Sequence, residues 1–292
     1  MKKFAKLLLF ILIFSFVLAF ISCSKKEENS NPPIIELIAA DGFISNDTIA
    51  GPASSLKFKV NCKSNGKHVL TNIIVSSNNT RVVDEGIYAE ELMQDVVLTK
   101  NSDLVEVIEF TIRDINGGEA SVSVIVELDE SAGDAEPIWY KNIELYAQNS
   151  ENTKGFLSLA EGQTFQLDEA MNDQANIHLL YYYDMVDSDE NTLSSPGANI
   201  DDSIYPLSGW TTRNTTRFIS KSLTQQEFEA INSVLFLVDS YNTSGNRKAK
   251  NLKVGNIYSF KDEARNKHGM FRVNSVEGED QGHVVITIVV QP

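Results

Sequence analysis

Apolar residues alternate with polar ones through much of residues 34–128, and no other feature restricts the fold of this chain as strongly. In residues 56–60 the polar positions are lysines, and in residues 105–112 most of them are glutamates. Side chains two residues apart share one face of a strand, so each of these segments is expected to be a strand with one buried face. Turn residues separate these segments from further strands, which we expect at 34–39, 69–76, 80–84 and 122–126.

About six or seven short strands in roughly 95 residues are typical of a β-sandwich. The segment 110–121, with the turn signal Asn116-Gly117, resembles the immunoglobulin-like modules found at the base of bacterial surface lipoproteins. That resemblance implies a spacer that lifts the next domain off a membrane. The disulfide and Trp of antibody domains are absent, because residues 34–128 contain one Cys and no Trp. The lone Cys62 continues the apolar face of the 56–60 strand and is expected to be a buried structural thiol.

The acidic, Pro-terminated segment 129–137 marks a boundary, so we predict an immunoglobulin-like β-sandwich at 34–130 and a second domain at 138–292. One helix is expected after Thr224, because Thr224 and Glu227 have the spacing of a capping box and apolar residues follow at helical intervals. Residues 234–238 could equally be a strand. The fold class is therefore mostly β, with a jelly-roll-like or α+β second domain and one short helix. Its strands are expected at 139–147, 155–159, 176–184, 252–260, 268–276 and 282–290.

The chain begins with three lysines, an uncharged apolar run and Ser22-Cys23. The run is about fifteen residues, shorter than the roughly twenty of a spanning helix. Residues 1–22 resemble a bacterial lipoprotein signal peptide, which implies lipid attachment at Cys23 and a membrane partner. An ordinary secretory signal with an incidental Cys and an uncleaved membrane anchor are the alternatives.

Residues 23–33 are polar and are expected to form a flexible tether. Lys26-Glu27-Glu28 resembles the export tag of surface lipoproteins from Bacteroidota. The resemblance implies an outer-membrane location with the protein facing the cell exterior, and a merely charged linker is the alternative.

The net charge of −15 excludes nucleic acid as a partner, because such a surface repels phosphate backbones. We predict no cofactor, no metal and no catalytic residue. Asp187, Asp189 and Asn191 have the first spacings of a calcium loop, but Thr192 replaces its glycine and Ala198 its bidentate glutamate. A solvated acidic loop is therefore expected there.

Aromatic residues of the second domain are the best candidates for ligand binding. Tyr181 and Tyr183 share one face of a predicted strand, and Trp210 lies in a polar loop with Arg213 and Asn214. Exposed rings stack on sugars while the polar neighbours supply hydrogen bonds, so a glycan is the predicted ligand. Packing of these rings in the core is the alternative. Trp139, directly after the linker, is expected to pack between the domains.

The segments 177–184, 191–196 and 269–290 resemble the C-terminal half of uncharacterised lipoproteins from Bacteroidota, some of which accompany glycan-uptake systems. Our leading hypothesis is a lipid-anchored, surface-exposed, non-enzymatic protein that presents a glycan-binding domain on an immunoglobulin-like spacer. The first alternative is a structural or assembly lipoprotein of the outer membrane with an envelope protein as partner. The second is a glycoside hydrolase, which would need two carboxylates that converge in a cleft.

Overall fold

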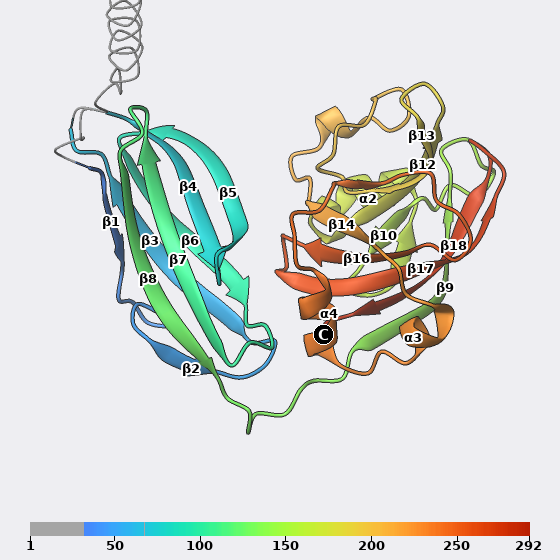
Figure 1. The fold of residues 1–292 in the computed structure, drawn as a ribbon. Helices are drawn as coiled ribbons and strands as arrows, with labels where there is room; N and C mark the ends of the chain where they lie inside the picture. Colours follow the sequence, from blue (N-terminus) through green and yellow to red (C-terminus); the bar gives the residue numbers. More distant parts are fainter. Residues whose placement is uncertain (1–31, 67) are drawn as a thin grey trace, which may run out of the picture.

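The computed structural model describes residues 32–66 and 68–292. The predicted signal peptide, Cys23 and most of the predicted tether lie outside these residues. Within them, no helix is long and apolar enough to cross a membrane. Strands hold 48% of the residues and helices 9%, which confirms the mostly-β fold class. Figure 1 shows two groups of strands side by side, which we call the N-terminal unit (residues 34–128) and the C-terminal unit (residues 138–290).

The N-terminal unit is a sandwich of two sheets. The parallel pair β2–β8 is the exception in an otherwise antiparallel arrangement. One sheet has the order β1 (Ile34–Leu37), β3 (Ser55–Lys63), β6 (Glu91–Thr99), and the other β2 (Thr48–Ala50), β8 (Glu119–Leu128), β7 (Val105–Asp114), β4 (Leu70–Ser77), β5 (Thr80–Ala89). This distribution of successive strands between two sheets is immunoglobulin-like.

Apolar faces of the two sheets meet in a core that has no disulfide. The rings of Phe58 and Phe110 lie 5.0 Å apart, and Cys62 is fully buried beside them. Burial raises the pKa of the Cys62 thiol to about 11, so at neutral pH it stays protonated and unreactive. The prediction of a buried structural thiol is confirmed.

A buried ion pair fixes the loop between β6 and β7. Lys100 Nζ lies 3.3 Å from Glu106 Oε2, and neither side chain is more than 3% exposed. Ser77 Oγ donates to the other oxygen of Glu106 at 2.6 Å, and Lys100 Nζ donates to the carbonyl of Asp103 at 2.7 Å. Buried charges are stable only when paired and hydrogen-bonded in this way, so the loop has one well-defined conformation.

The C-terminal unit also consists of two sheets, each with five antiparallel strands. The first has the order β14 (Thr216–Lys221), β16 (Ile257–Asp262), β17 (Lys267–Glu277), β18 (His283–Val290), β9 (Ile138–Tyr146). The second has the order β11 (Gln163–Phe165), β10 (Phe156–Ser158), β12 (Leu179–Asp184), β13 (Asp189–Ser194), β15 (Lys248–Ala249). Apolar residues from both sheets form one core between them, so β14 and β15, each at the end of its sheet, come close together.

The single helix predicted after Thr224 is interrupted. The capping box is present and starts α3 (Gln225–Glu229), but Ser233 caps a separate helix, α4 (Val234–Ser240), by accepting a hydrogen bond from the amide of Phe236. Residues 234–238 are therefore helical. A third short helix, α2 (Leu167–Asn172), and the 3-10 turns η1 (Gln174–Asn176) and η2 (Leu207–Gly209) were not expected.

Trp139 packs within the C-terminal unit, and the prediction that it lies between domains is wrong. Its ring meets Phe228 of α3 edge-on at 5.5 Å. Both residues belong to an apolar cluster that seats α3 and α4 on the outer face of the first sheet. The linker brings Trp139 to this sheet because β9 is its edge strand.

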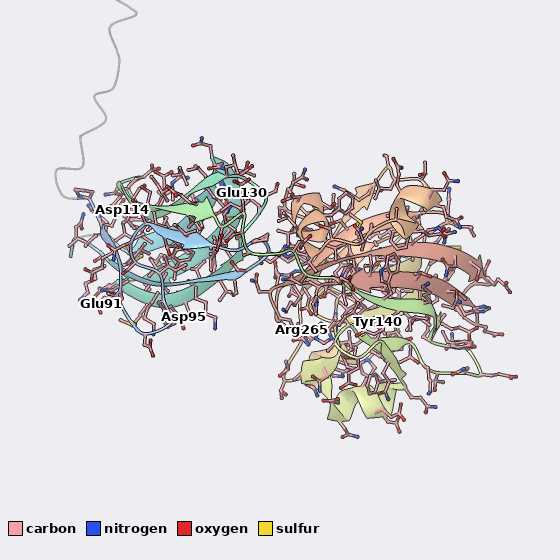
Figure 2. The ribbon with its side chains drawn as sticks, turned by 90° about the horizontal axis from the view of Figure 1, so that it is seen from below. Glu91, Asp95, Asp114, Glu130, Tyr140 and Arg265 are labelled. Atoms are coloured by element: carbon pink, nitrogen blue, oxygen red, sulfur yellow. The ribbon has the colours of Figure 1, made fainter. Side chains whose placement is uncertain are left out.

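The two units touch directly, and the segment that connects them is held in place. The carbonyl of Ala135 accepts a hydrogen bond from the amide of Val234 at the start of α4. Figure 2 shows Glu130 on the connecting segment and Arg265 on the side of the C-terminal unit that faces its neighbour. Hydrogen bonds between the units include those from Asn266 Nδ2 to Thr99 Oγ1 (3.0 Å), from Gln291 Nε2 to Ala53 O (3.2 Å) and from Ser102 N to Asp239 Oδ1 (3.1 Å).

Candidate functional site

Most of the aromatic residues expected to bind a ligand lie inside the C-terminal unit. Tyr181 is 0% exposed between the two sheets, and its hydroxyl donates to Asn191 Oδ1 at 2.8 Å. Trp210 is 6% exposed and packs against Phe156 at 5.8 Å, because loops and short helices cover the outer face of the second sheet. Stacking on a sugar needs an exposed ring face, so this placement does not fit the ligand-binding role predicted for Tyr181 and Trp210. Tyr183 is half-buried.

The two polar neighbours of Trp210, Arg213 and Asn214, differ in burial. Asn214 is buried, and its Nδ2 donates to the carbonyls of Ala175 and Ile177, both at 2.8 Å. Its amide therefore satisfies the backbone of a turn and is not free for a ligand. Arg213 is exposed and lines a small cavity of about 380 Å³.

The acidic segment 187–191, which lacks the glycine and glutamate of a calcium loop, is only partly exposed to solvent. Asp189 is the first residue of β13, and it is 1% exposed. Its carboxylate contacts the ammonium groups of Lys248 and Lys250, and it accepts a hydrogen bond from the Tyr182 hydroxyl at 2.5 Å. The expectation of a solvated loop is wrong for Asp189, because its cationic partners come from a distant part of the chain. In the described residues no group of three or more His, Cys, Asp and Glu side chains could hold a metal ion.

Burial by itself would raise the pKa of Asp189. Hydrogen bonds from Lys248, Lys250 and Tyr182 outweigh that effect, and the pKa lies below its usual value. Asp189 is therefore an anion at neutral pH and holds both lysines. Asp184 lies opposite Asp189 in the β12–β13 pair and Glu190 follows it in the chain, so further acidic residues lie near the two lysines.

The last strands of the two sheets are joined at one residue pair. Phe218 N donates to Asn246 O at 2.7 Å, and Asn246 N donates to Phe218 O at 3.0 Å. A Cβ atom at Gly245 would lie 2.8 Å from Phe218 O, so a glycine is needed for the loop to approach this closely. Beside this pair the two strands diverge and leave a cavity of about 630 Å³. We call it the β14–β15 groove.

Backbone groups along the groove alternate in direction, as in any antiparallel strand. Ser195 N donates to Arg247 O, so residues 247 and 249 bond to β13 while residues 246 and 248 face the groove. On the opposite side Phe218 faces the groove, and Ser220 does so for the same reason. Within the part of the chain that the structure describes, Phe218 and Asn246 exchange two backbone hydrogen bonds across the groove, and the peptide groups of residues 220 and 248 make none across it.

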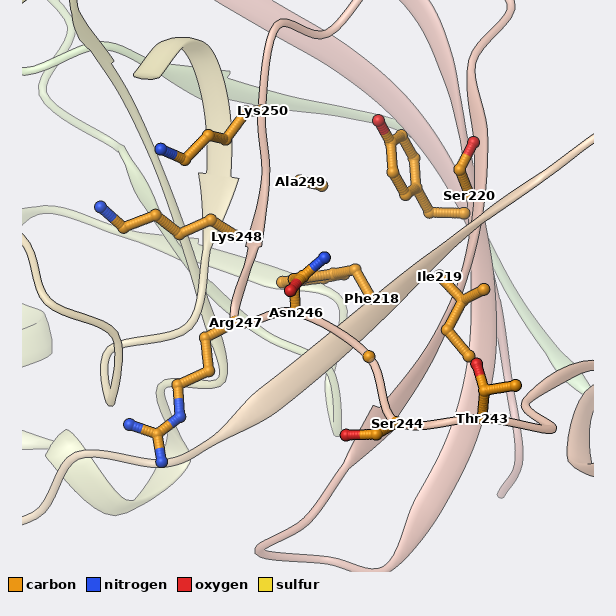
Figure 3. A pocket seen from close by; sticks show the side chains of 12 residues that line it. Phe218, Ile219, Ser220, Thr243, Ser244, Asn246, Arg247, Lys248, Ala249 and Lys250 are labelled. Carbon is orange, nitrogen blue, oxygen red and sulfur yellow. The ribbon is translucent and has the colours of Figure 1, made fainter. Parts of the chain in front are cut away.

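Side chains around the groove are mainly polar. Thr243, Ser244 and Asn246 are exposed, so the groove reaches the surface. Figure 3 shows Lys248 and Lys250 extending from their segment away from Ile219 and Ser220. The cations therefore flank the groove, and its inner wall is largely backbone. The lining residues are Phe218, Ile219, Ser220, Thr243, Ser244, Gly245, Asn246, Arg247, Lys248, Ala249, Lys250 and Tyr258.

The cavity that contains Arg213 is acidic. Asp201 and Asp202 line it, and serine hydrogen bonds to each carboxylate lower the pKa of both. A glycosidase needs one carboxylic acid with a raised pKa as proton donor. These two groups have shifts in the opposite direction, so they do not make such a pair.

A buried polar cluster lies at the base of the β16–β17 hairpin. His178 Nδ1 accepts a hydrogen bond from the amide of Leu159, and its Nε2 lies 3.5 Å from Asp262 Oδ2. Arg265 Nη1 is 3.8 Å from the same oxygen. Burial raises the pKa of Asp262 to about 6, while burial and Arg265 lower the pKa of His178 to about 4. His178 is thus a neutral core residue whose Nδ1 is occupied by backbone.

None of the residues that line the groove was predicted from the sequence as a ligand-binding residue. The available signal was the segment 247–250, which places three cations among four residues of a chain with a net charge of −15. Its neighbours across the groove lie about thirty residues earlier, a separation that no local pattern reports.

Comparisons with known proteins give no family. No family model matches the chain, and no curated protein matches its sequence. A solved structure of a DUF4466 family protein from Parabacteroides merdae is similar at 13% identity and a TM-score of 0.39, over 89% of this chain and 98% of that one. Fibronectin(III)-like modules of CbhA from Clostridium thermocellum are similar at 8% identity and a TM-score of 0.25, over 79% and 87% of the two chains. Scores this low support no conclusion about function.

We expect Asp262→Asn to gain stability relative to the wild type as the pH rises from about 4 to 7, by up to about 3 kcal/mol. An acid whose pKa is raised on folding favours the folded state at low pH, and this contribution is lost as the pH rises through about 6. His178 contributes with the opposite sign, and because its Nε2 lies 3.5 Å from Asp262 Oδ2, the comparison reports the net change of the two groups.

Urea unfolding followed by tryptophan fluorescence measures this difference, because both tryptophans, Trp139 and Trp210, lie in the C-terminal unit. A stability difference that stays constant across the pH range would contradict the titration of Asp262.

Proposed function

We propose that this protein is a lipid-anchored, non-enzymatic binding protein of the outer membrane that faces the cell exterior and holds an extended ligand in the β14–β15 groove. The groove carries the proposal. Its volume of about 630 Å³ lies within the range of roughly 300–1,000 Å³ that is common for ligand sites. Its walls combine hydroxyl, amide and unbonded peptide groups with a partly buried Tyr258 ring.

Two classes of ligand have chemistry that suits this lining. A glycan, the ligand expected from the sequence, would use the hydroxyl and amide side chains together with the ring of Tyr258. An extended segment of an envelope protein would use the free peptide groups. Both ligands are polymers that could lie along the groove.

A hydrolase is less well supported than a binding protein. None of the twelve residues that line the groove is an acid, and the acidic cavity near Arg213 has carboxylates with lowered pKa values. Glycoside hydrolysis needs two carboxylates in one site, one of them with a raised pKa.

Anchoring rests on the sequence of residues 1–33, and the N-terminal unit suits the role of a spacer. Its sheets have a closed apolar core, and its surface carries acidic side chains such as Glu91 and Asp95 (Figure 2). One acyl chain binds membranes reversibly, and two or more hold a protein stably. The C-terminal unit would then be presented away from the membrane.

Replacement of Cys23 by serine should release the mature protein into the soluble fraction, because no acyl chain can be attached. The measurement is fractionation together with the intact mass of the mature chain, with Cys62→Ser as the control that keeps the anchor. Wild-type protein found in the soluble fraction without lipid mass at position 23 would refute the anchor.

A bulky side chain at the mouth of the groove should block the ligand. We expect Ser220→Trp to weaken binding by about tenfold or more, a change of roughly 1.4 kcal/mol, while Thr212→Trp, exposed and outside the groove, leaves it unchanged. The full mature chain is probed with a glycan array and a displayed peptide library. The proposal fails if neither library yields a ligand, or if every ligand found binds both variants equally.

A further inference from the structure

We propose that the two units are held in one fixed orientation, and that the buried ion pair Lys100–Glu106 maintains the surface on which the C-terminal unit docks. This orientation is independent of the binding function proposed above, because it holds whether or not the groove takes a ligand. The N-terminal unit then directs the C-terminal unit, whereas a simple spacer would leave its direction free.

The contacts between the units gather at one corner of the N-terminal unit. In the three hydrogen bonds given above, the groups on this unit belong to Thr99, Ser102 and Ala53. Thr99 and Ser102 lie within two residues of Lys100 in the chain. Ala53 is the backbone partner of Lys100, since its amide donates to Lys100 O at 3.1 Å. All three contacts therefore converge on Lys100.

The Lys100 side chain supports this corner from inside. Its ammonium lies 3.3 Å from Glu106 Oε2 on β7 and donates to the carbonyls of Asn101 (3.1 Å) and Asp103 (2.7 Å). The amide of Lys100 also donates to Ser54 O at 2.9 Å. One buried cation thus ties the loop after β6 and the turn before β3 to β7. These two segments carry the groups that meet the C-terminal unit.

The side chains that reach across from the C-terminal unit are themselves fixed. Gln291 is buried, and its Oε1 accepts a hydrogen bond from His268 N at 3.2 Å while its Nε2 donates to Ala53 O. Asn266 lies in the turn between β16 and β17 with a φ of +49°, a left-handed conformation that asparagine tolerates. Fixed side chains lose little conformational entropy on docking, so their contacts favour one orientation.

The connecting segment is anchored to both units. Asp129 N donates to Ala50 O at 2.9 Å in the N-terminal unit. Leu235 N, in the first turn of α4, donates to Asp134 Oδ1 at 3.1 Å. Residues 130–133 separate these two anchors, and so short a connection keeps the docking surfaces at a high effective concentration.

The interface is polar, which makes its geometry decisive. Each of the four apolar clusters lies within one unit. Polar interfaces between domains usually permit relative motion, and a hydrogen bond between neutral groups contributes little net free energy. The orientation therefore depends on several contacts that fit at the same time. The Lys100–Glu106 pair keeps the groups for those contacts in place.

The test measures the distance between spin labels on the two units by pulsed electron paramagnetic resonance. Labels are attached at Met93→Cys and Val254→Cys, both exposed and outside the contacts described, in the full mature chain that carries Cys23→Ser. Cys62 does not compete for the label, because it is buried and its thiol stays protonated. We expect a single narrow distribution of distances.

Removal of the side chains that cross the interface should free the units. We expect Asn266→Gly with Gln291→Ala to broaden the distribution by about twofold or more, because relative motion is the default for domains without such contacts. The matched control is Asn251→Gly with Gln281→Ala. It makes the same changes at exposed sites, one of which also has a positive φ and the other of which lies at the opposite end of β18, and it should leave the distribution unchanged.

The ion pair is tested with Lys100→Met combined with Glu106→Gln, which removes both buried charges and keeps side chains of similar size. Ser77 Oγ can still donate to the amide that replaces the carboxylate. We expect the distribution to broaden by about twofold or more, since the contacts lose their shared support, while the NMR amide signals of β3 and β7 remain those of the folded sandwich. A role confined to stability would leave the distribution narrow.

A broad distribution in the chain without interface substitutions would overturn the fixed orientation, and so would a narrow one after Asn266→Gly with Gln291→Ala. A narrow distribution in the folded Lys100→Met, Glu106→Gln chain would overturn the role of the ion pair. Loss of the folded sandwich in that chain would overturn it too, because the pair would then support the unit itself. None of these results depends on a ligand, so they leave the proposed binding function to its own test.

Discussion

The exchange of two hydrogen bonds between Phe218 and Asn246 determines the shape of the candidate site. Phe218 is buried in the core between the sheets, so it fixes the position at which the loop before β15 must approach β14. Gly245 permits this approach because a side chain there would meet the backbone of Phe218. Since the strands are joined at one pair and then diverge, the outward-facing peptide groups of Ser220 and Lys248 make no backbone hydrogen bond across the groove. The groove is a consequence of how the two sheets close.

Local sequence patterns predicted the strands whose faces differ in burial. The 105–112 segment became β7, because its polar and apolar residues alternate as a sandwich strand requires. Asp189 was assigned to a solvated loop, since its partners Lys248 and Lys250 lie some sixty residues later and leave no local trace. Trp210 was misjudged for a related reason: whether a ring is covered depends on a further layer of the fold.

The charge distribution connects the proposals for anchoring and binding. The net charge of −15 would keep copies of the protein apart if they were tethered to one membrane, as proposed. Beside the groove, cations and acids are interspersed, because Asp189 holds Lys248 and Lys250 and lies opposite Asp184 in the β12–β13 pair.

Amide hydrogen exchange, resolved to single residues by NMR, tests the central claim most directly. If the groove is open as described, the amides of Ser220 and Lys248 exchange rapidly in the free protein, while those of Phe218 and Asn246 are protected by their mutual hydrogen bonds. Protection of the Ser220 and Lys248 amides in the free protein would show that the edges are already paired, and it would contradict this account.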